Sequence, residues 1–179
     1  PCIYDIDGNS YGEGDQTTHA KVTQEMLHDG HWLIPTNKGK PYINKPPFKM
    51  WLVAAPVKLL GESTFSYRIL DGIIGVLTVA AIYLFAALLF NSRLCGYLAA
   101  LAQLGCTGWF FGHGVRESVQ DGAMIFFTVL ALICGYRFVE TAVRRPAEFR
   151  PEDDTRRLIR LAALGGLFVG LGLMTKSAA

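Results

Sequence analysis

The sequence has long stretches without any charged residue, and this absence is its most informative property. Residues 73–90 and residues 94–112 contain no Asp, Glu, Lys or Arg. With residues 69–72, the first stretch has 22 residues, which as a helix would be about 33 Å long at ~1.5 Å per residue and could cross a bilayer. Hydrophobic residues make up 51% of the chain and are bunched, which predicts a membrane protein rather than an ordinary soluble domain.

The sequence also lacks a cysteine framework. Its four cysteines form no CxxC pair, and Cys95, Cys106 and Cys134 lie within apolar segments, where cysteine behaves as a small hydrophobic residue. Neither a disulfide scaffold nor a cysteine-based metal site is therefore indicated.

A strong net charge is missing as well. The formal charge of +2 does not indicate nucleic-acid binding. It is unevenly placed, however, because six arginines fall between Arg144 and Arg160, and the positive-inside rule then places the loop of residues 140–157 in the cytoplasm. The chain has no initiator methionine and no signal-like start, so we expect a fragment, preceded by at least one membrane helix and followed by a further part.

The hydrophobic pattern predicts an all-α, polytopic membrane protein. Four transmembrane helices are predicted, at about residues 69–90, 94–112, 121–139 and 158–175. Residues 1–68 are predicted to form an outer loop with two helices at the membrane interface, at about residues 16–28 and 47–60. Pro56 is expected to kink or end the second of these helices.

Counting the spans backwards from the cytoplasmic loop places several charged residues on one side of the membrane. Residues 1–68 and 113–120 then lie outside, and the fourth span ends outside. The charged residues that share this side are Asp15, Lys45, Arg116, Glu117, Asp121 and Lys176. An enzyme that acts on a phosphate-bearing lipid at the membrane surface would need such a gathering of charge.

Four motifs follow one another along the chain. Residues 30–35 read GHWLIP, a Lys-Pro-Pro turn follows at residues 45–47, and FSYRILDGIIGVLTV and GLGLMTK come further on. In this order they resemble motifs of the polyprenyl-phosphate-dependent GT-C glycosyltransferases, which include protein O-mannosyltransferases and the lipid A aminoarabinose transferase. The family's acidic pair stands here as Asp15-Gln16, with Thr18 where an arginine is frequent.

This resemblance implies a GT-C fold and an inverting transfer of a sugar from a polyprenyl-phosphate carrier to a lipid, glycan or protein acceptor. The expected place is the outer face of the cytoplasmic membrane, and neither a metal nor another cofactor is implied. The alternative is a non-catalytic transporter or binding protein for lipid-linked sugars, although the nearly charge-free spans favour surface chemistry over transport.

The resemblance assigns the general base to Asp15 and donor-phosphate binding to Lys45. A base must take the acceptor's proton, and a cation must stabilise the departing phosphate. The alternative for Asp15 is a helix cap near Thr17, and for Lys45 a turn lysine that contacts lipid headgroups.

Arg116 and Lys176 are further candidates for phosphate binding, and Asp121 is a second candidate catalytic acid. Lys176 could instead extend to the headgroups, Arg116 could be an ordinary solvated charge, and Asp121 could form a capping box with Ser118.

Other polar and glycine patterns have simpler interpretations. His28 and His31, with His19 nearby, are expected to be surface residues rather than metal ligands. Asp71 is expected to pair locally with Arg68. Residues 166–170 form a GxxxG motif that permits close helix packing.

Overall fold

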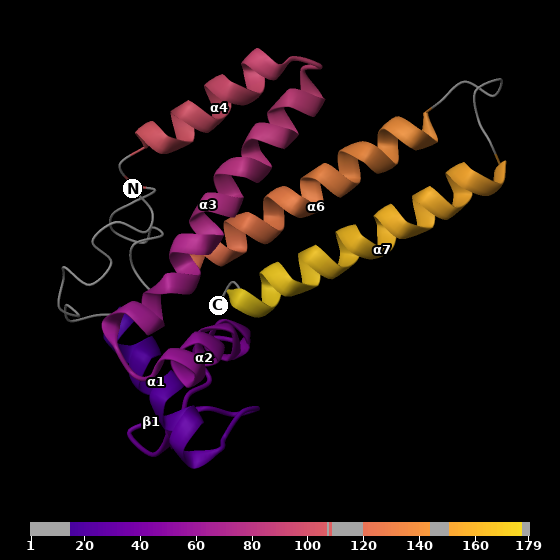
Figure 1. Ribbon diagram of the computed structural model, residues 1–179. Coiled ribbons are helices and arrows are strands. Elements are labelled where there is room, and N and C mark those ends of the chain that lie inside the picture. The colour runs from indigo at the N-terminus through magenta and orange to yellow at the C-terminus, as the bar shows by residue number, and fades with distance from the viewer. Residues whose placement is uncertain (1–14, 107, 109–119, 144–150, 177–179) are drawn as a thin grey trace.

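The computed structural model describes residues 15–106, 108, 120–143 and 151–176. The described chain is almost wholly helical (Figure 1). Its elements are α1 (Asp15–Asp29), β1 (Thr36–Asn37), β2 (Lys40–Pro41), α2 (Phe48–Leu60), α3 (Thr64–Leu89), α4 (Arg93–Gly105), α6 (Asp121–Ala142) and α7 (Pro151–Thr175).

Three of these helices, α3, α6 and α7, are long and apolar enough to cross a membrane. The predicted spans were 69–90, 121–139 and 158–175, so α3 and α7 both begin earlier than predicted. In α7 the extra turns start at Pro151 and continue through Glu152, Asp153 and Asp154. Proline suits the first helical position, and acidic side chains favour the positive end of the helix dipole.

The predicted span at residues 94–112 differs from the structure. Helix α4 ends at Gly105, and Cys106 has an extended backbone with φ −77° and ψ 108°. Its 13 residues measure about 20 Å at ~1.5 Å per residue, less than the roughly 30 Å of a bilayer core. Most of the remaining segment lies outside the described residues.

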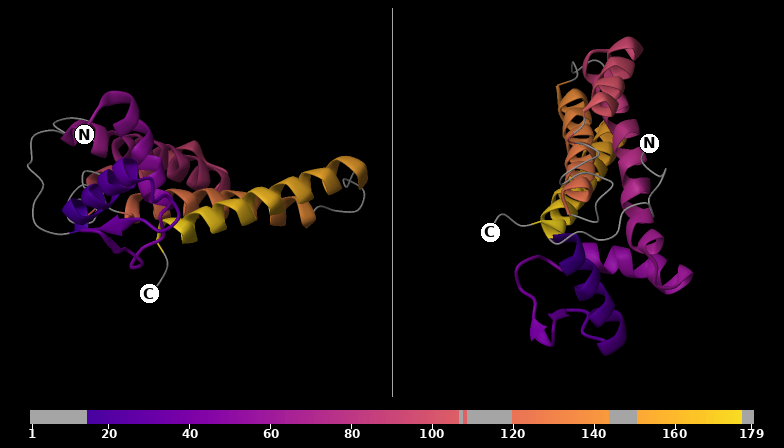
Figure 2. Two further views of the ribbon diagram at one scale, coloured as in Figure 1. Left: turned by 90° about the horizontal axis from the view of Figure 1, so that it is seen from below. Right: turned by 90° about the vertical axis from the view of Figure 1, so that its left-hand side faces the viewer.

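The segment before α3 packs on the end of the long helices. Helices α1 and α2 lie beyond the start of α3, at the end of the molecule where α7 finishes (Figures 1 and 2). Val22 and Met26 of α1 pack with Met50 and Ala54 of α2 in a small buried core. The two predicted interfacial helices, 16–28 and 47–60, correspond to α1 and α2, which are packed against each other.

A short β-hairpin lies where the sequence predicted only loop. Strands β1 and β2 are antiparallel, with Thr36 opposite Pro41. Lys38 and Gly39 between them both have positive φ, 54° and 71°, the requirement of a tight type I′ turn. The hairpin is anchored to α1 because the Glu25 carboxylate accepts hydrogen bonds from Thr36 Oγ1 at 2.8 Å and from the backbone N–H of Lys38 at 2.6 Å.

Helix α2 continues through Pro56 to Leu60, where the predicted range of residues 47–60 also ends, so Pro56 does not end the helix. The chain turns at Gly61, whose φ of 81° suits glycine. Helix α3 then begins with a capping box, in which Ser63 Oγ accepts from Ser66 N–H at 3.1 Å and Ser66 Oγ accepts from Ser63 N–H at 3.0 Å. This local signal explains why α3 starts at Thr64.

Glycines allow the long helices to approach each other, but not where the GxxxG motif suggested. A Cβ on Gly96 of α4 would lie 2.8 Å from the backbone oxygen of Tyr83 in α3. A Cβ on Gly172 of α7 would meet Phe127 Cβ of α6 at 3.6 Å, whereas Gly166 and Gly170 meet nothing within 4 Å among the described residues. The predicted packing role of the motif therefore falls to its neighbours Gly172 and Gly165, since a Cβ on Gly165 would meet Cys134 Cβ of α6 at 3.4 Å.

Candidate active site

Two of the predicted site residues, Asp121 and Lys176, form an ion pair. Asp121 is the first residue of α6 and Lys176 follows the last residue of α7, 55 positions later. The Lys176 ammonium donates a hydrogen bond to Asp121 Oδ1. The lysine side chain keeps 35% of its surface exposed and the aspartate 19%, so the ammonium has room to contact a further anion.

The start of α6 and the ion pair bear on the alternative roles, which were a capping box for Asp121 and contact with lipid headgroups for Lys176. Gln120 is the residue that precedes α6, and it makes no side-chain capping bond. Asp121 is therefore the first helical residue and not the third residue of a capping box led by Ser118, which lies outside the described residues. Lys176 contacts a carboxylate rather than extending alone into the headgroup region.

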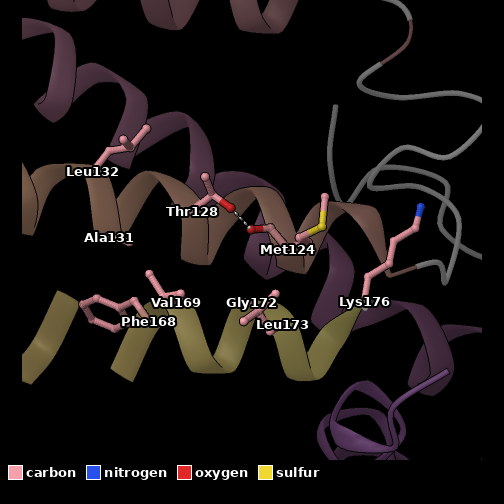
Figure 3. Close-up of a pocket in the computed structure, with 9 residues that line it drawn as sticks. All are labelled: Met124, Thr128, Ala131, Leu132, Phe168, Val169, Gly172, Leu173 and Lys176. Carbon is pink, nitrogen blue, oxygen red and sulfur yellow. Dashed lines mark hydrogen bonds between the residues drawn. The ribbon is translucent and has the colours of Figure 1, made fainter. Parts of the chain in front are cut away.

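An apolar groove leads away from Lys176 along the surface between α6 and α7. It has a volume of about 420 Å³ and combines a lysine at one end with mainly hydrophobic walls (Figure 3). Its lining residues are Met124, Thr128, Ala131, Leu132, Phe168, Val169, Gly172, Leu173 and Lys176. The Thr128 hydroxyl donates to Met124 O at 2.8 Å. Lys176 is the charged residue among those that line the groove. This shape suits an amphiphile with an anionic head.

A second, fully buried ion pair joins α2 to α3. The Lys49 ammonium donates to Asp71 Oδ1, and the two side chains are only 3% and 2% exposed. Lys49 therefore lies in the protein interior and not at the surface of α2. Asp71 was expected to pair with Arg68 one turn away, and its long-range partner Lys49 was missed because charge spacing within one helix cannot reveal a contact between two helices.

The start of α2 also touches the helices that hold Asp121 and Lys176. The ring of Phe48 lies 6.1 Å from that of Phe127 in α6, and Phe127 lies 6.4 Å from Phe168 in α7. Phe48 directly follows the Lys-Pro-Pro turn of residues 45–47. The turn that presents the partly buried Lys45 is thus fixed at the end of the molecule where the Asp121–Lys176 pair lies.

The remaining predicted site residues are less fully described. Asp15 is the first residue of α1, but its side chain lies outside the described part, as does the whole of Arg116. Helix α1 begins at Asp15 itself rather than near Thr17. The proposed roles of Asp15 and Arg116 therefore stay predictions.

Two of the histidines, His28 and His19, contact other side chains. His28 Nε2 lies 2.9 Å from Glu62 Oε1, and Gln24 Nε2 donates to the other oxygen of the same carboxylate at 2.8 Å. His19 packs edge-on against Tyr42, with the ring centres 6.5 Å apart. Within the described residues, no three His, Cys, Asp or Glu side chains gather as metal ligands would.

Comparison with known proteins identifies the family. The family model described as dolichyl-phosphate-mannose-protein mannosyltransferase matches residues 44–179, which include the Lys-Pro-Pro turn, Asp121 and Lys176. The chain belongs to this family. Among solved structures, ArnT from Cupriavidus metallidurans in the apo state is similar over 98% of this chain and 30% of its own, with a TM-score of 0.76 and 19% identity. The likeness confirms the predicted all-α, polytopic membrane fold of GT-C type.

Curated relatives of this mannosyltransferase family member have a more specific name. An undecaprenyl phosphate-alpha-4-amino-4-deoxy-L-arabinose arabinosyl transferase from Pseudomonas savastanoi pv. phaseolicola is 30% identical over 162 residues, or 90% of this chain and 28% of the relative. The protein of that name from Photorhabdus laumondii is 25% identical over 173 residues, or 96% and 29%. The chain thus spans less than a third of the length of these relatives.

Proposed function

We propose that the protein is a membrane glycosyltransferase that moves a sugar from a polyprenyl-phosphate carrier to a lipid, glycan or protein acceptor. Two findings support this proposal: the membership of the mannosyltransferase family, and the similarity to relatives named as arabinosyl transferases that act with undecaprenyl phosphate. A second structure of the Cupriavidus ArnT, bound to undecaprenyl phosphate, resembles the chain with a TM-score of 0.69 and 17% identity. The proposed site faces the outer side of the cytoplasmic membrane.

The observation that carries the proposal is the position of Lys176. Its ammonium stands at one end of an apolar groove and is held by Asp121. The phosphate head of a polyprenyl phosphate requires such a cation, and its hydrocarbon tail requires an apolar surface. A lysine has three donors, so one hydrogen bond to Asp121 leaves two for phosphate oxygens. Lys45 and Arg116 supply further positive charge for the departing phosphate.

The two acids, Asp15 and Asp121, have different roles in the transfer reaction. Asp15 takes the proton from the acceptor hydroxyl as the acceptor oxygen forms a bond to the anomeric carbon of the sugar. The bond from that carbon to the phosphate oxygen breaks, and polyprenyl phosphate leaves with the electron pair. This single displacement inverts the anomeric centre. Asp121 serves the same step by holding the Lys176 ammonium toward the phosphate.

The test replaces the proposed general base, Asp15, and the proposed phosphate-binding residue Lys45 in the full-length protein. Asp15→Asn and Lys45→Ala should each reduce transfer from a radiolabelled polyprenyl-phosphate sugar by at least about 100-fold, the range of a lost general base or charge stabiliser. Asp29→Asn at the other end of α1 and Lys40→Ala on the exposed hairpin are the matched controls. Near-normal turnover in both site variants contradicts the proposal, and donor binding without turnover in the wild type favours a non-catalytic protein.

A further inference from the structure

Gln120 is a buried amide with unsatisfied hydrogen-bonding groups beside the Asp121–Lys176 pair. The residue is 2% exposed, and neither its Nε2 nor its Oε1 has a hydrogen-bond partner in the part of the chain that the structure describes. Leaving a buried donor or acceptor unpaired is unfavourable by about 1–3 kcal/mol for each group. The usual partners that complete such groups from outside the chain are a ligand, an ion or an ordered water.

Gln120 directly precedes α6 and lies one helical turn before a residue that lines the groove. Its backbone has φ −84° and ψ −18°, close to helical values, and its carbonyl oxygen accepts from Met124 N–H at 3.1 Å. Residues four apart on a helix share one face, and Met124 lines the groove together with Lys176. Gln120 thus stands one turn before Met124, at the end where the lysine lies.

We propose that Gln120 is a specificity-determining residue that hydrogen-bonds the sugar of the polyprenyl-phosphate donor. The inference rests on the function proposed above. Phosphate oxygens only accept hydrogen bonds and could satisfy Nε2 alone. A sugar hydroxyl or amino group both donates and accepts, so it satisfies Oε1 and Nε2 together.

The assignment divides recognition of the donor between Lys176 and Gln120. Lys176 binds the phosphate, which every polyprenyl-phosphate donor carries, and Gln120 binds the sugar, in which donors differ. A site that hydrogen-bonds a substrate hydroxyl discriminates strongly against a ligand that lacks it, because the buried amide is then left unpaired. The wild-type protein should therefore bind a sugar-bearing polyprenyl phosphate more tightly than bare undecaprenyl phosphate.

The test uses the full-length protein with Gln120→Leu, which keeps the size of the side chain and removes its polar atoms. The first measurement is the thermal midpoint without ligand. It should be unchanged or higher in Gln120→Leu, because the substitution removes a buried amide that has no protein partner. Gln103→Leu, at a partly buried glutamine on α4, is the matched control.

The second measurement compares undecaprenyl phosphate with the sugar-bearing donor that the wild type turns over fastest, chosen from aminoarabinose- and mannose-bearing polyprenyl phosphates. In Gln120→Leu, kcat/KM and affinity for the sugar-bearing donor should fall about tenfold to a hundredfold, as expected for one or two lost hydrogen bonds. The affinity for undecaprenyl phosphate should stay within about twofold. Gln103→Leu should change neither.

Two outcomes overturn the assignment of Gln120. A thermal midpoint several degrees lower in the ligand-free variant would mean that the amide is satisfied within the protein. An undiminished preference for the sugar-bearing lipid would mean that another group recognises the sugar. A wild type that binds these lipids but turns over none of them contradicts the proposed transfer reaction instead, and the midpoint and affinity difference still decide the role of Gln120.

Discussion

Lys49 and Asp71 are buried together in the contact between α2 and α3. Removing two charges from water is unfavourable by several kcal/mol for each, and their attraction compensates only while both are present. The pair therefore makes α2 and α3 dependent on each other at one point. Because Lys49 lies four residues after Lys45, this point also fixes where the Lys-Pro-Pro turn enters α2.

We predict that Lys49→Met destabilises the protein by about 3–5 kcal/mol, because it leaves Asp71 buried without the lysine. The double variant Lys49→Met/Asp71→Leu should recover most of this loss, since two apolar side chains can replace a buried pair. Thermal unfolding in detergent measures both effects. Lys58→Met, at an exposed lysine of the same helix, should shift stability by less than about 0.5 kcal/mol. A double variant as unstable as the single one would contradict this account.

At the scale of elements, the hairpin β1–β2 depends on one carboxylate of α1. Glu25 accepts hydrogen bonds from Thr36 Oγ1 and from the N–H groups of Lys38 and Gly39. The hydrogen bond from the Thr36 side chain, with those from the two N–H groups, lowers the pKa of Glu25 below its usual 4.5, although partial burial opposes the shift. The two-residue strands are too short to be stable alone, so Glu25 holds the turn in place.

The stability of the hairpin should depend on pH in one direction. A carboxyl whose pKa is lower in the folded state contributes its full stabilisation above its unfolded pKa, and this is lost as the pH falls through the folded pKa. Hydrogen exchange of residues 36–41, corrected for intrinsic rates, should therefore accelerate below about pH 4.5 in the wild type. In Glu25→Gln the exchange should already be fast at neutral pH. An unchanged pH profile in Glu25→Gln would refute the anchoring role.

Helices were predictable from sequence where local signals agree, and contacts between helices were not. The prolines before Phe48 and the charge-free run after Gly72 predicted α2 and α3 to within a few residues. Pro56 does not end α2, because the residues around it are packed in the protein interior and retain the helix. The segment at residues 94–112 is uniformly apolar, so its composition gave no sign that α4 stops at Gly105.

The candidate site was predictable in part for the same reason. Topology placed Asp121 and Lys176 on one side of the membrane, and the structure joins them in an ion pair. The Lys49–Asp71 pair and the buried amide of Gln120 depend on how helices dock. No periodicity within one helix encodes that docking, so sequence reasoning missed both.

At the scale of the whole molecule, the bundle of long helices has two different ends: a polar end, which carries Asp121 and Lys176, and a turn end, where α3 connects to α4. Helices α1 and α2 lie at the end that holds Asp121 and Lys176, and the turn between α3 and α4 lies at the opposite end (Figure 1). Asn91 in that turn has a positive φ of 48°, a backbone conformation that asparagine tolerates better than most residues. The positive-inside rule predicts that the turn faces the cytoplasm and the polar end faces outward.

Labelling with a membrane-impermeant maleimide tests this orientation. In a variant without the native cysteines, Asn44→Cys next to the Lys-Pro-Pro turn should react in intact cells. Asn91→Cys should react only after the membrane is permeabilised, and both asparagines are exposed. The reverse pattern would place the site on the cytoplasmic side and refute the proposed location.

The pairing of Lys49 with Asp71 has a consequence for how the chain enters the membrane during synthesis. Asp71 lies about 10 Å along α3 from its start, at ~1.5 Å per residue, and an unpaired carboxylate near the bilayer centre adds about 3 kcal/mol to the free energy of insertion and less toward the edge. Helix α2 leaves the ribosome before α3 does. Its lysine is therefore synthesised before the acid with which it pairs, so the counter-charge already exists when α3 inserts.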